Sequence, residues 1–205
     1  MAREKSFKEA AMGIPFVYRT TQRWLGDSLE NDYLVSEFIQ PEPNTSVLDV
    51  GCGVASILEC LNDVDYVGVD HNPDYIAKAQ EAFGKRGSFH VADVSELSGL
   101  VNKKFERILL LRVLHHLTDV QCDELLNRCS KLLNPGGALI TFDCAVTADQ
   151  HWIARRLAKA DRGRHARSPD HYLRLISPHF GTVKTDIRHD LKRVPYTHFT
   201  VRASS

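Results

Sequence analysis

The chain has 205 residues, roughly the size of one α/β domain, and its 43% hydrophobic and 25% charged residues are ordinary for a globular protein. Its formal net charge at pH 7 is zero, which argues against a nucleic-acid-binding protein, because such proteins carry a strongly basic face. The sequence holds no run of about 18 apolar residues, so it predicts no membrane-spanning helix.

The first 40 residues have an amphipathic helical pattern in which Tyr33, Leu34 and Phe38 share one face. From residue 46 to residue 142, short apolar segments alternate with helical patterns. The expected strands are residues 46–50, 66–69, 88–91, 107–111 and 138–142. Strands that alternate with helices in this way predict a parallel sheet with crossover connections.

Three helical patterns lie between these strands. The first carries Ala55, Ile57, Leu58 and Leu61. The second opens at Asn72-Pro73, where a capping residue precedes a proline, and the third opens at the capping box Thr118-x-x-Gln121. The third helix is expected to stop at residues 134–137, whose sequence Asn-Pro-Gly-Gly cannot continue a helix.

The pattern changes after residue 142. We expect a helical piece near residues 150–160, a polar loop at 161–168 and a short helix at 169–176. Two β-rich segments, 182–189 and 196–201, are close enough in sequence to form an antiparallel hairpin at one edge of the sheet. The predicted fold is therefore α/β: a Rossmann-like, doubly wound, seven-stranded sheet, mainly parallel with an antiparallel edge strand, and with helices on both faces.

A glycine-containing turn follows the first strand. Asp49, Gly51 and Gly53 form the string D-x-G-x-G, and Asp70 ends the next apolar run, in a place where an acid can bind a ribose diol. Ser56 stands where a dinucleotide-binding G-x-G-x-x-G turn has its third glycine. A carboxylate at position 49 would repel a pyrophosphate but attract the ammonium of an amino-acid tail. The turn therefore favours S-adenosylmethionine, and a nicotinamide-dependent oxidoreductase is the less favoured alternative.

Five motifs follow one another in the chain: VLDVGCGVAS at 47–56, YVGVDHNPDYI at 66–76, FHVADV at 89–94, FERILLLRVLHHL at 105–117 and LLNPGG at 132–137. In this order they resemble the class I S-adenosylmethionine-dependent methyltransferases, in their small-molecule branch, over roughly residues 43–145. We expect one methyltransferase domain, with a helical N-terminal cap at 1–42, a cofactor-binding core at 43–145, and a substrate-cover segment with the closing hairpin at 146–205.

The resemblance implies a cofactor site. Asp49 would serve the amino group of S-adenosylmethionine, Gly51 and Gly53 would turn beneath its methionine part, and Asp70 would accept hydrogen bonds from both ribose hydroxyls. The further positions implied on the cofactor side are Cys52 in the turn, His71 near the adenine, Asp93 and the Val94 backbone at the adenine edge, Leu111 at the sulfonium end and Tyr18 folding over the cofactor from the N-terminal region.

The chain departs from this family at two places. Ala55 replaces the family's third glycine, and Leu111 and Arg112 stand where the family often has polar residues. The second departure leaves open an alternative function, a non-catalytic S-adenosylmethionine-binding protein of the same fold.

Methyl transfer requires mainly that the reactants are oriented, with a base where the acceptor must lose a proton. The candidate base is His116 and then His115, just after the fourth strand, and Arg112 could orient an anionic acceptor. We expect no metal, because the histidines lack ligand spacing such as H-x-x-x-H and the five cysteines contain no C-x-x-C pair.

The C-terminal quarter is basic: residues 151–205 hold twelve Lys and Arg against four Asp and Glu. This excess predicts a small anionic acceptor, such as a sugar or secondary-metabolism intermediate, methylated on oxygen or nitrogen. The candidate acceptor-binding residues are Arg162, Arg164 and His165, with Arg167 beside them, and Tyr196 and His198 in the last strand. The alternative is that these basic residues form an ordinary solvated surface.

The cysteines, odd in number, fit a reducing compartment, so we expect a cytoplasmic protein. We further expect no nucleic-acid partner and a monomer or homodimer.

Overall fold

The computed structural model describes residues 27–93, 103–152, 154–156, 165–192 and 195–204. Four of the residues discussed above, Tyr18, Val94, Arg162 and Arg164, lie outside these ranges. Within them, no helix combines the length and apolar character needed to cross a membrane.

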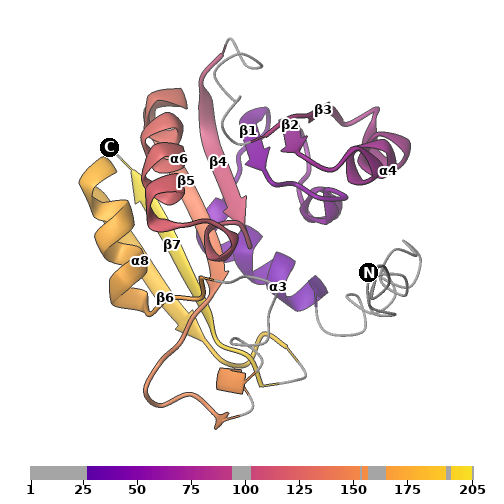
Figure 1. The fold of residues 1–205 in the computed structure, drawn as a ribbon. Coiled ribbons are helices and arrows are strands. Elements are labelled where there is room, and N and C mark those ends of the chain that lie inside the picture. The colour runs from indigo at the N-terminus through magenta and orange to yellow at the C-terminus, as the bar shows by residue number, and fades with distance from the viewer. Residues whose placement is uncertain (1–26, 94–102, 153, 157–164, 193–194, 205) are drawn as a thin grey trace, which may run out of the picture.

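One sheet of seven strands organises the molecule (Figure 1). The strands are β1 (Thr45–Val50), β2 (Val64–Asp70), β3 (Gly87–Val91), β4 (Phe105–Leu111), β5 (Leu133–Cys144), β6 (Thr182–Arg188) and β7 (His198–Ser204). Their order is β3-β2-β1-β4-β5-β7-β6, and β7 runs antiparallel to both of its neighbours. The predicted seven-stranded, mainly parallel sheet is confirmed. The reversed strand, β7, lies one position inside the edge strand β6.

Helical segments cover both faces of the sheet. On one face lie α6 (Asp119–Leu132) and α8 (Pro169–Ile176), which Figure 1 shows side by side, with the short turns η3 (Leu114–His116) and η4 (Ser177–His179) at their ends. The other face is covered by α3 (Asp27–Leu34), η1 (Val35–Ile39), η2 (Ser56–Glu59) and α4 (Pro73–Phe83).

The predicted helix starts are confirmed by side-chain caps. The Asn72 side chain accepts a hydrogen bond from the backbone N–H of Asp74 at the start of α4, and Thr118 with Gln121 forms a complete capping box at the start of α6. Such caps satisfy backbone donors that have no partner inside the helix, which stabilises a helix by about 1 kcal/mol each.

Two elements differ from the prediction. The helix expected after the first strand is a single 3₁₀ turn, because Ala55 adopts a left-handed conformation (φ 57°) before it and Asp63 (φ 48°) turns the chain back into β2 soon afterwards. The fifth strand begins at Leu133 rather than Ala138, and its pairing with β4 is irregular across the stretch that contains Gly136 (φ 77°).

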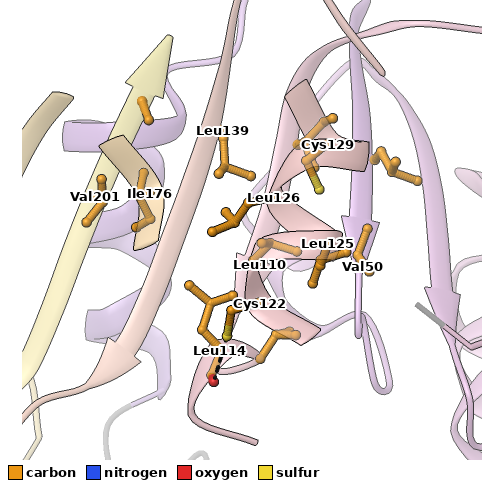
Figure 2. Packing of buried hydrophobic residues seen from close by; sticks show 14 of the residues in the cluster. Val50, Leu110, Leu114, Cys122, Leu125, Leu126, Cys129, Leu139, Ile176 and Val201 are labelled. Carbon is orange, nitrogen blue, oxygen red and sulfur yellow. Dashed lines mark hydrogen bonds between the residues drawn. The ribbon is translucent and has the colours of Figure 1, made fainter. Parts of the chain in front are cut away.

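The core consists of two apolar layers, one on each face of the sheet. Figure 2 shows the α6 layer, where Leu125 and Leu126 pack on Leu110 and Leu139 of the sheet. In the other layer, Phe38 and its neighbours from α3 and η1 pack on strand residues that include Val47 and Phe142. Since successive strand residues point to opposite faces, Asp49 lies on the same face as Val47, beneath α3 rather than α6.

Candidate functional site

The carboxyl ends of β1, β2, β4 and β5 meet at one edge of the sheet. In register, Asp49 pairs with Gly68 of β2 and with Leu109 of β4, and Val50 pairs with Val69. Open α/β sheets bind ligands at this edge, where the strand order reverses. The predicted cofactor residues of β1 and β2 are therefore brought together here.

The glycine turn leaves β1 tightly and exposes its backbone. The N–H groups of Gly51 and Cys52 both donate to the carbonyl of Val69, at 2.7 and 3.0 Å. Gly51 has φ 76° and Gly53 has φ 56°, conformations that favour glycine. A Cβ atom at Gly53 would meet no atom within 4 Å, so this side of the turn is open to a ligand.

Asp70 holds the turn against β2. One carboxylate oxygen accepts a hydrogen bond from the backbone N–H of Gly53 at 2.9 Å, and the other accepts one from the N–H of Asn72 at 2.8 Å. The side chain is buried, whereas His71 beside it is 80% exposed. Because a carboxylate offers about four acceptor positions, two further donors, such as a diol, fit on Asp70.

Asp49 is a buried carboxylate with an unsatisfied oxygen. The Tyr66 hydroxyl donates to Oδ2 at 2.6 Å, while Oδ1 has no hydrogen-bond partner in the described part of the chain. Burial raises the pKa of Asp49 to about 7; the Tyr66 hydrogen bond and the positive charge of Arg112 oppose this rise, and the charge of Asp70 adds to it. A buried carboxylate oxygen in this state fits a cationic ligand group, which would satisfy Oδ1 and favour the ionised form.

The other cofactor-side candidates occupy varied positions. Cys52 is half-buried, and burial raises the pKa of its thiol far above the usual range, so the thiol is unreactive. Leu111 is half-buried at the end of β4, and Asp93 is exposed two residues after β3.

A second polar cluster lies next to Asp49 and is centred on Glu30 of α3, whose side chain is fully buried. Arg112 forms an ion pair with one Glu30 oxygen, while His198 Nε2 at 2.9 Å and Lys192 Nζ at 3.4 Å contact the other. Burial alone would raise the pKa of Glu30, but the charge of Arg112, the His198 contact and the charge of Lys192 together lower it to about 2. Glu30 is therefore ionised at neutral pH.

Aromatic rings hold the same cluster together. Phe142 stacks on His198, with ring centroids 4.6 Å apart and planes inclined by 14°, and the Arg112 guanidinium lies 5.5 Å from the Phe142 ring centre. Tyr196 contacts His198, with ring centroids 4.9 Å apart. Arg112 itself has a left-handed backbone (φ 63°), a conformation that is strained for arginine and typical of functional sites. We call Glu30, Arg112, Phe142, Lys192, Tyr196 and His198 the Glu30 cluster.

The structure thus brings together three predicted residues, Arg112, Tyr196 and His198, through a residue that the sequence analysis missed. Glu30 precedes Leu34 by four residues and Phe38 by eight, so it lies on the apolar face of the N-terminal helix. An acid at that position was the available signal, because a charged residue on a buried face needs a partner.

The remaining predicted residues lie around η3. His115 is buried, and its Nδ1 and its backbone N–H lie 2.7 and 3.1 Å from one oxygen of Asp143. His116 is exposed beside it, with the two rings 4.1 Å apart. The backbone N–H of His165 donates to the carbonyl of His115 at 3.1 Å. These contacts give His115 a structural role; a base role for His116 stays a prediction.

The assignment of Arg167 to anion binding was wrong. Its guanidinium is buried and donates to the carbonyls of Leu114, Leu117 and His165, at 2.6 to 3.0 Å, and to the carboxylate of Asp119 at 2.7 Å. Sequence alone could not separate this residue from the neighbouring arginines, because its partners Leu114, Leu117 and Asp119 lie about 50 residues away in the chain. No group of three or more His, Cys, Asp or Glu within the described ranges could hold a metal ion.

Comparison with known proteins places this site in context. Residues 47–137 match a family model described as a methyltransferase domain. An O-methyltransferase of Pyrenophora dematioidea is 28% identical over 113 residues, which cover 51% of this chain and 41% of the relative. The chain spans less than half the length of the curated relatives it matches, between 38% and 49%.

Solved structures share the fold. The N-methyltransferase NodS of Bradyrhizobium japonicum, solved in complex with S-adenosyl-L-homocysteine, superposes with a TM-score of 0.67 and 16% identity, over 85% of this chain and 84% of that one. The pyocyanin biosynthetic protein PhzM superposes with a TM-score of 0.68 and 17% identity, over 87% of this chain and 55% of that one.

Proposed function

We propose that this chain, which belongs to the class I S-adenosylmethionine-dependent methyltransferase family, binds S-adenosylmethionine at the edge formed by Asp49 and Asp70 and transfers its methyl group to a small acceptor. The observation that carries the proposal is the unpartnered Oδ1 of the buried Asp49, directly below an open glycine turn. An amino-acid ammonium fits this oxygen, whereas a pyrophosphate would be repelled by it.

The residues present fit the cofactor. Asp49 would pair with its ammonium, Asp70 would take the two ribose hydroxyls, and the backbone of Gly51 to Gly53 would lie against its amino-acid tail. S-adenosylmethionine supplies a methyl group on a positively charged sulfur, a good leaving group. The protein then has mainly to orient the two reactants and to exclude water from them.

The acceptor is proposed to be a small anionic molecule, methylated on oxygen or nitrogen. Within the Glu30 cluster, Arg112 and Lys192 carry two positive charges against the one negative charge of Glu30, and their side chains are 31% and 17% exposed. This positive excess beside the cofactor edge supports a carboxylate or phosphate ligand. Arg162, Arg164 and His165 remain proposed as further acceptor contacts.

The anionic preference can be tested with matched phenols. We expect 3,4-dihydroxybenzoate to be methylated faster than catechol, which lacks the carboxylate, in assays that follow transfer of a labelled methyl group. Equal rates for the two phenols would remove the anionic preference but not the methyltransferase assignment.

Cofactor binding is tested by calorimetric titration with S-adenosylmethionine. Asp70→Asn keeps the side-chain size but removes the charge, and we expect the affinity to fall about 10- to 100-fold, the usual cost of losing charged hydrogen bonds. The matched control is Asp65→Asn on the same strand, whose exposed carboxylate pairs only with Lys103 among the described residues. Failure of the folded wild-type protein to bind S-adenosylmethionine would refute the proposed function.

A further inference from the structure

We propose that His198, oriented by Glu30, is the base that accepts the acceptor's proton during methyl transfer, and that it does so through its Nδ1 atom. This inference rests on the proposed function and assigns a catalytic residue within it. It places the base on β7, away from the histidine pair that follows β4.

The orientation of His198 is fixed from two directions. Its Nε2 lies 2.9 Å from Oε1 of Glu30, and its ring is stacked on Phe142. Both side chains of the ion pair are buried, with 2% exposure for His198 and none for Glu30. A flip of this buried imidazole about its Cβ–Cγ bond would break the contact with Glu30, and a tilt of the ring would break the stacking on Phe142.

This contact determines which nitrogen of His198 carries the proton. Because the Glu30 carboxylate is ionised, the 2.9 Å ion-pair contact between Nε2 and Oε1 favours a proton on Nε2, which leaves the lone pair on Nδ1. Oε1, like Nδ1, has no aligned hydrogen-bond partner among the described residues. Nδ1 is buried and has no hydrogen-bond partner among the residues that the structure describes. A buried acceptor without a partner is costly unless a ligand satisfies it, which points to the hydroxyl or amine of the acceptor.

The surroundings keep His198 neutral in the resting protein. Burial lowers the pKa of His198, and the positive charges of Lys192 and Arg112 lower it further. The contact with Glu30 and the negative charge of Glu30 raise the pKa and offset part of this decrease. The titratable or charged groups that face His198 from the packed elements are Glu30 on α3, Arg112 after β4, Cys144 on β5, Arg188 on β6, and Lys192 and Tyr196 between β6 and β7. A neutral imidazole is the form that can accept a proton.

His198 also lies on the same face of the sheet as the cofactor edge. The pleat places Asp49, Phe142 and His198 on the face covered by α3, and the charge of Arg112 acts on both Asp49 and His198. The buried His198 is linked to the surface through Arg112, Lys192 and Tyr196, which are partly exposed. His198 and the cofactor edge therefore share one face of the sheet.

A second carboxylate–histidine pair, Asp143 with His115, does not meet these conditions. Asp143 pairs in register with Phe199, a residue of the α6 and α8 layer, so its side chain lies on the face opposite Asp49. The Nδ1 of His115 is already engaged by Asp143, and its backbone N–H is bonded to the same oxygen. This pair anchors η3 to β5.

The proposed step balances without a further reactant. The proton of the acceptor O–H or N–H moves to Nδ1, and the acceptor's electron pair forms the bond to the methyl carbon. The carbon–sulfur bond breaks and its pair stays on sulfur, which becomes neutral. The imidazolium that forms is stabilised by the Glu30 carboxylate on its other nitrogen.

The first test is the protonation state of His198, measured by NMR on the full chain with ¹⁵N-labelled histidine. The His198→Gln variant assigns the signals. We expect a neutral ring at pH 7, with the proton on Nε2 and bare Nδ1, and we expect Glu30→Gln to abolish this preference. A proton on Nδ1 in the wild-type protein would overturn the proposal, whether or not any acceptor is known.

The second test measures methyl transfer to 3,4-dihydroxybenzoate. His198→Gln should lower the rate about 10²- to 10⁴-fold and remove the acidic limb of the pH profile, while calorimetric binding of S-adenosylmethionine stays unchanged. The control is His179→Gln, at the α6 face, whose Nε2 lies 2.8 Å from Asp123. An unchanged rate and pH profile in His198→Gln would overturn the base role.

The two proposals fail differently. A folded wild-type protein that does not bind S-adenosylmethionine refutes the proposed function. A protein that binds the cofactor but carries its His198 proton on Nδ1 refutes only the base role. If the phenol is bound but not methylated, the NMR result decides the base role by itself.

Discussion

Replacing Asp49 with asparagine should stabilise the folded protein and weaken cofactor binding at the same time. The pKa of Asp49 is raised from 3.8 to about 7 by burial, and one pKa unit corresponds to about 1.4 kcal/mol, so ionising Asp49 costs the folded state about 4 kcal/mol. Since the folded-state pKa is the higher one, stability falls as the pH rises from about 4 to about 7 and is constant above that. Asp49→Asn removes this loss.

Denaturant unfolding of both proteins at pH 5 and pH 8 measures the effect. We expect Asp49→Asn to be the more stable protein at pH 8 by up to about 4 kcal/mol, with a smaller difference at pH 5. Asp65→Asn, which removes an exposed charge from the neighbouring strand, should change stability by less than about 1 kcal/mol at either pH.

Binding should respond in the opposite direction. If the ammonium of S-adenosylmethionine pairs with Asp49, wild-type affinity rises with pH up to about 7 and binding below that pH releases a proton. Calorimetry in two buffers of different ionisation enthalpy counts the protons. In Asp49→Asn we expect affinity to be about 10- to 100-fold weaker and independent of pH. Wild-type affinity that is flat from pH 5.5 to 8, or full affinity in the variant, would refute the reasoning.

Two backbone-supporting residues give further predictions. In Gly51→Ala the new Cβ would lie 2.7 Å from a methyl group of Val113 at φ 76°, and we expect a loss of about 2–4 kcal/mol in the free energy of unfolding. Gly136→Ala, at φ 77° with no atom within 4 Å, should lose only about 1 kcal/mol; equal losses would contradict the steric argument. Arg167→Ala removes a guanidinium donor from three carbonyls, and we expect thermal unfolding to show a loss of about 3 kcal/mol with cofactor affinity unchanged. Arg167→Lys should not restore the loss, because an ammonium cannot reproduce the planar fork; full rescue would show that charge alone suffices.

The sequence alone determined the architecture. Alternating apolar segments and helical patterns and the caps at Asn72 and Thr118 are local signals, and the structure confirms them except for the helix expected after β1. Such signals survive in sequence because a cap or a strand depends on residues a few positions apart. The cofactor roles of the acids at positions 49 and 70 stay predictions.

Only the tertiary structure decided how the acceptor side is built. Glu30 and Arg112 are 82 residues apart in the chain, and His198 reaches the same carboxylate from the last strand. The same limit explains why Arg167 looked like an anion ligand. The sequence does not show whether a charged side chain faces water or a buried partner, because packing between distant segments decides this. When packing buries a charged group, the cost of removing it from water means that it needs a partner.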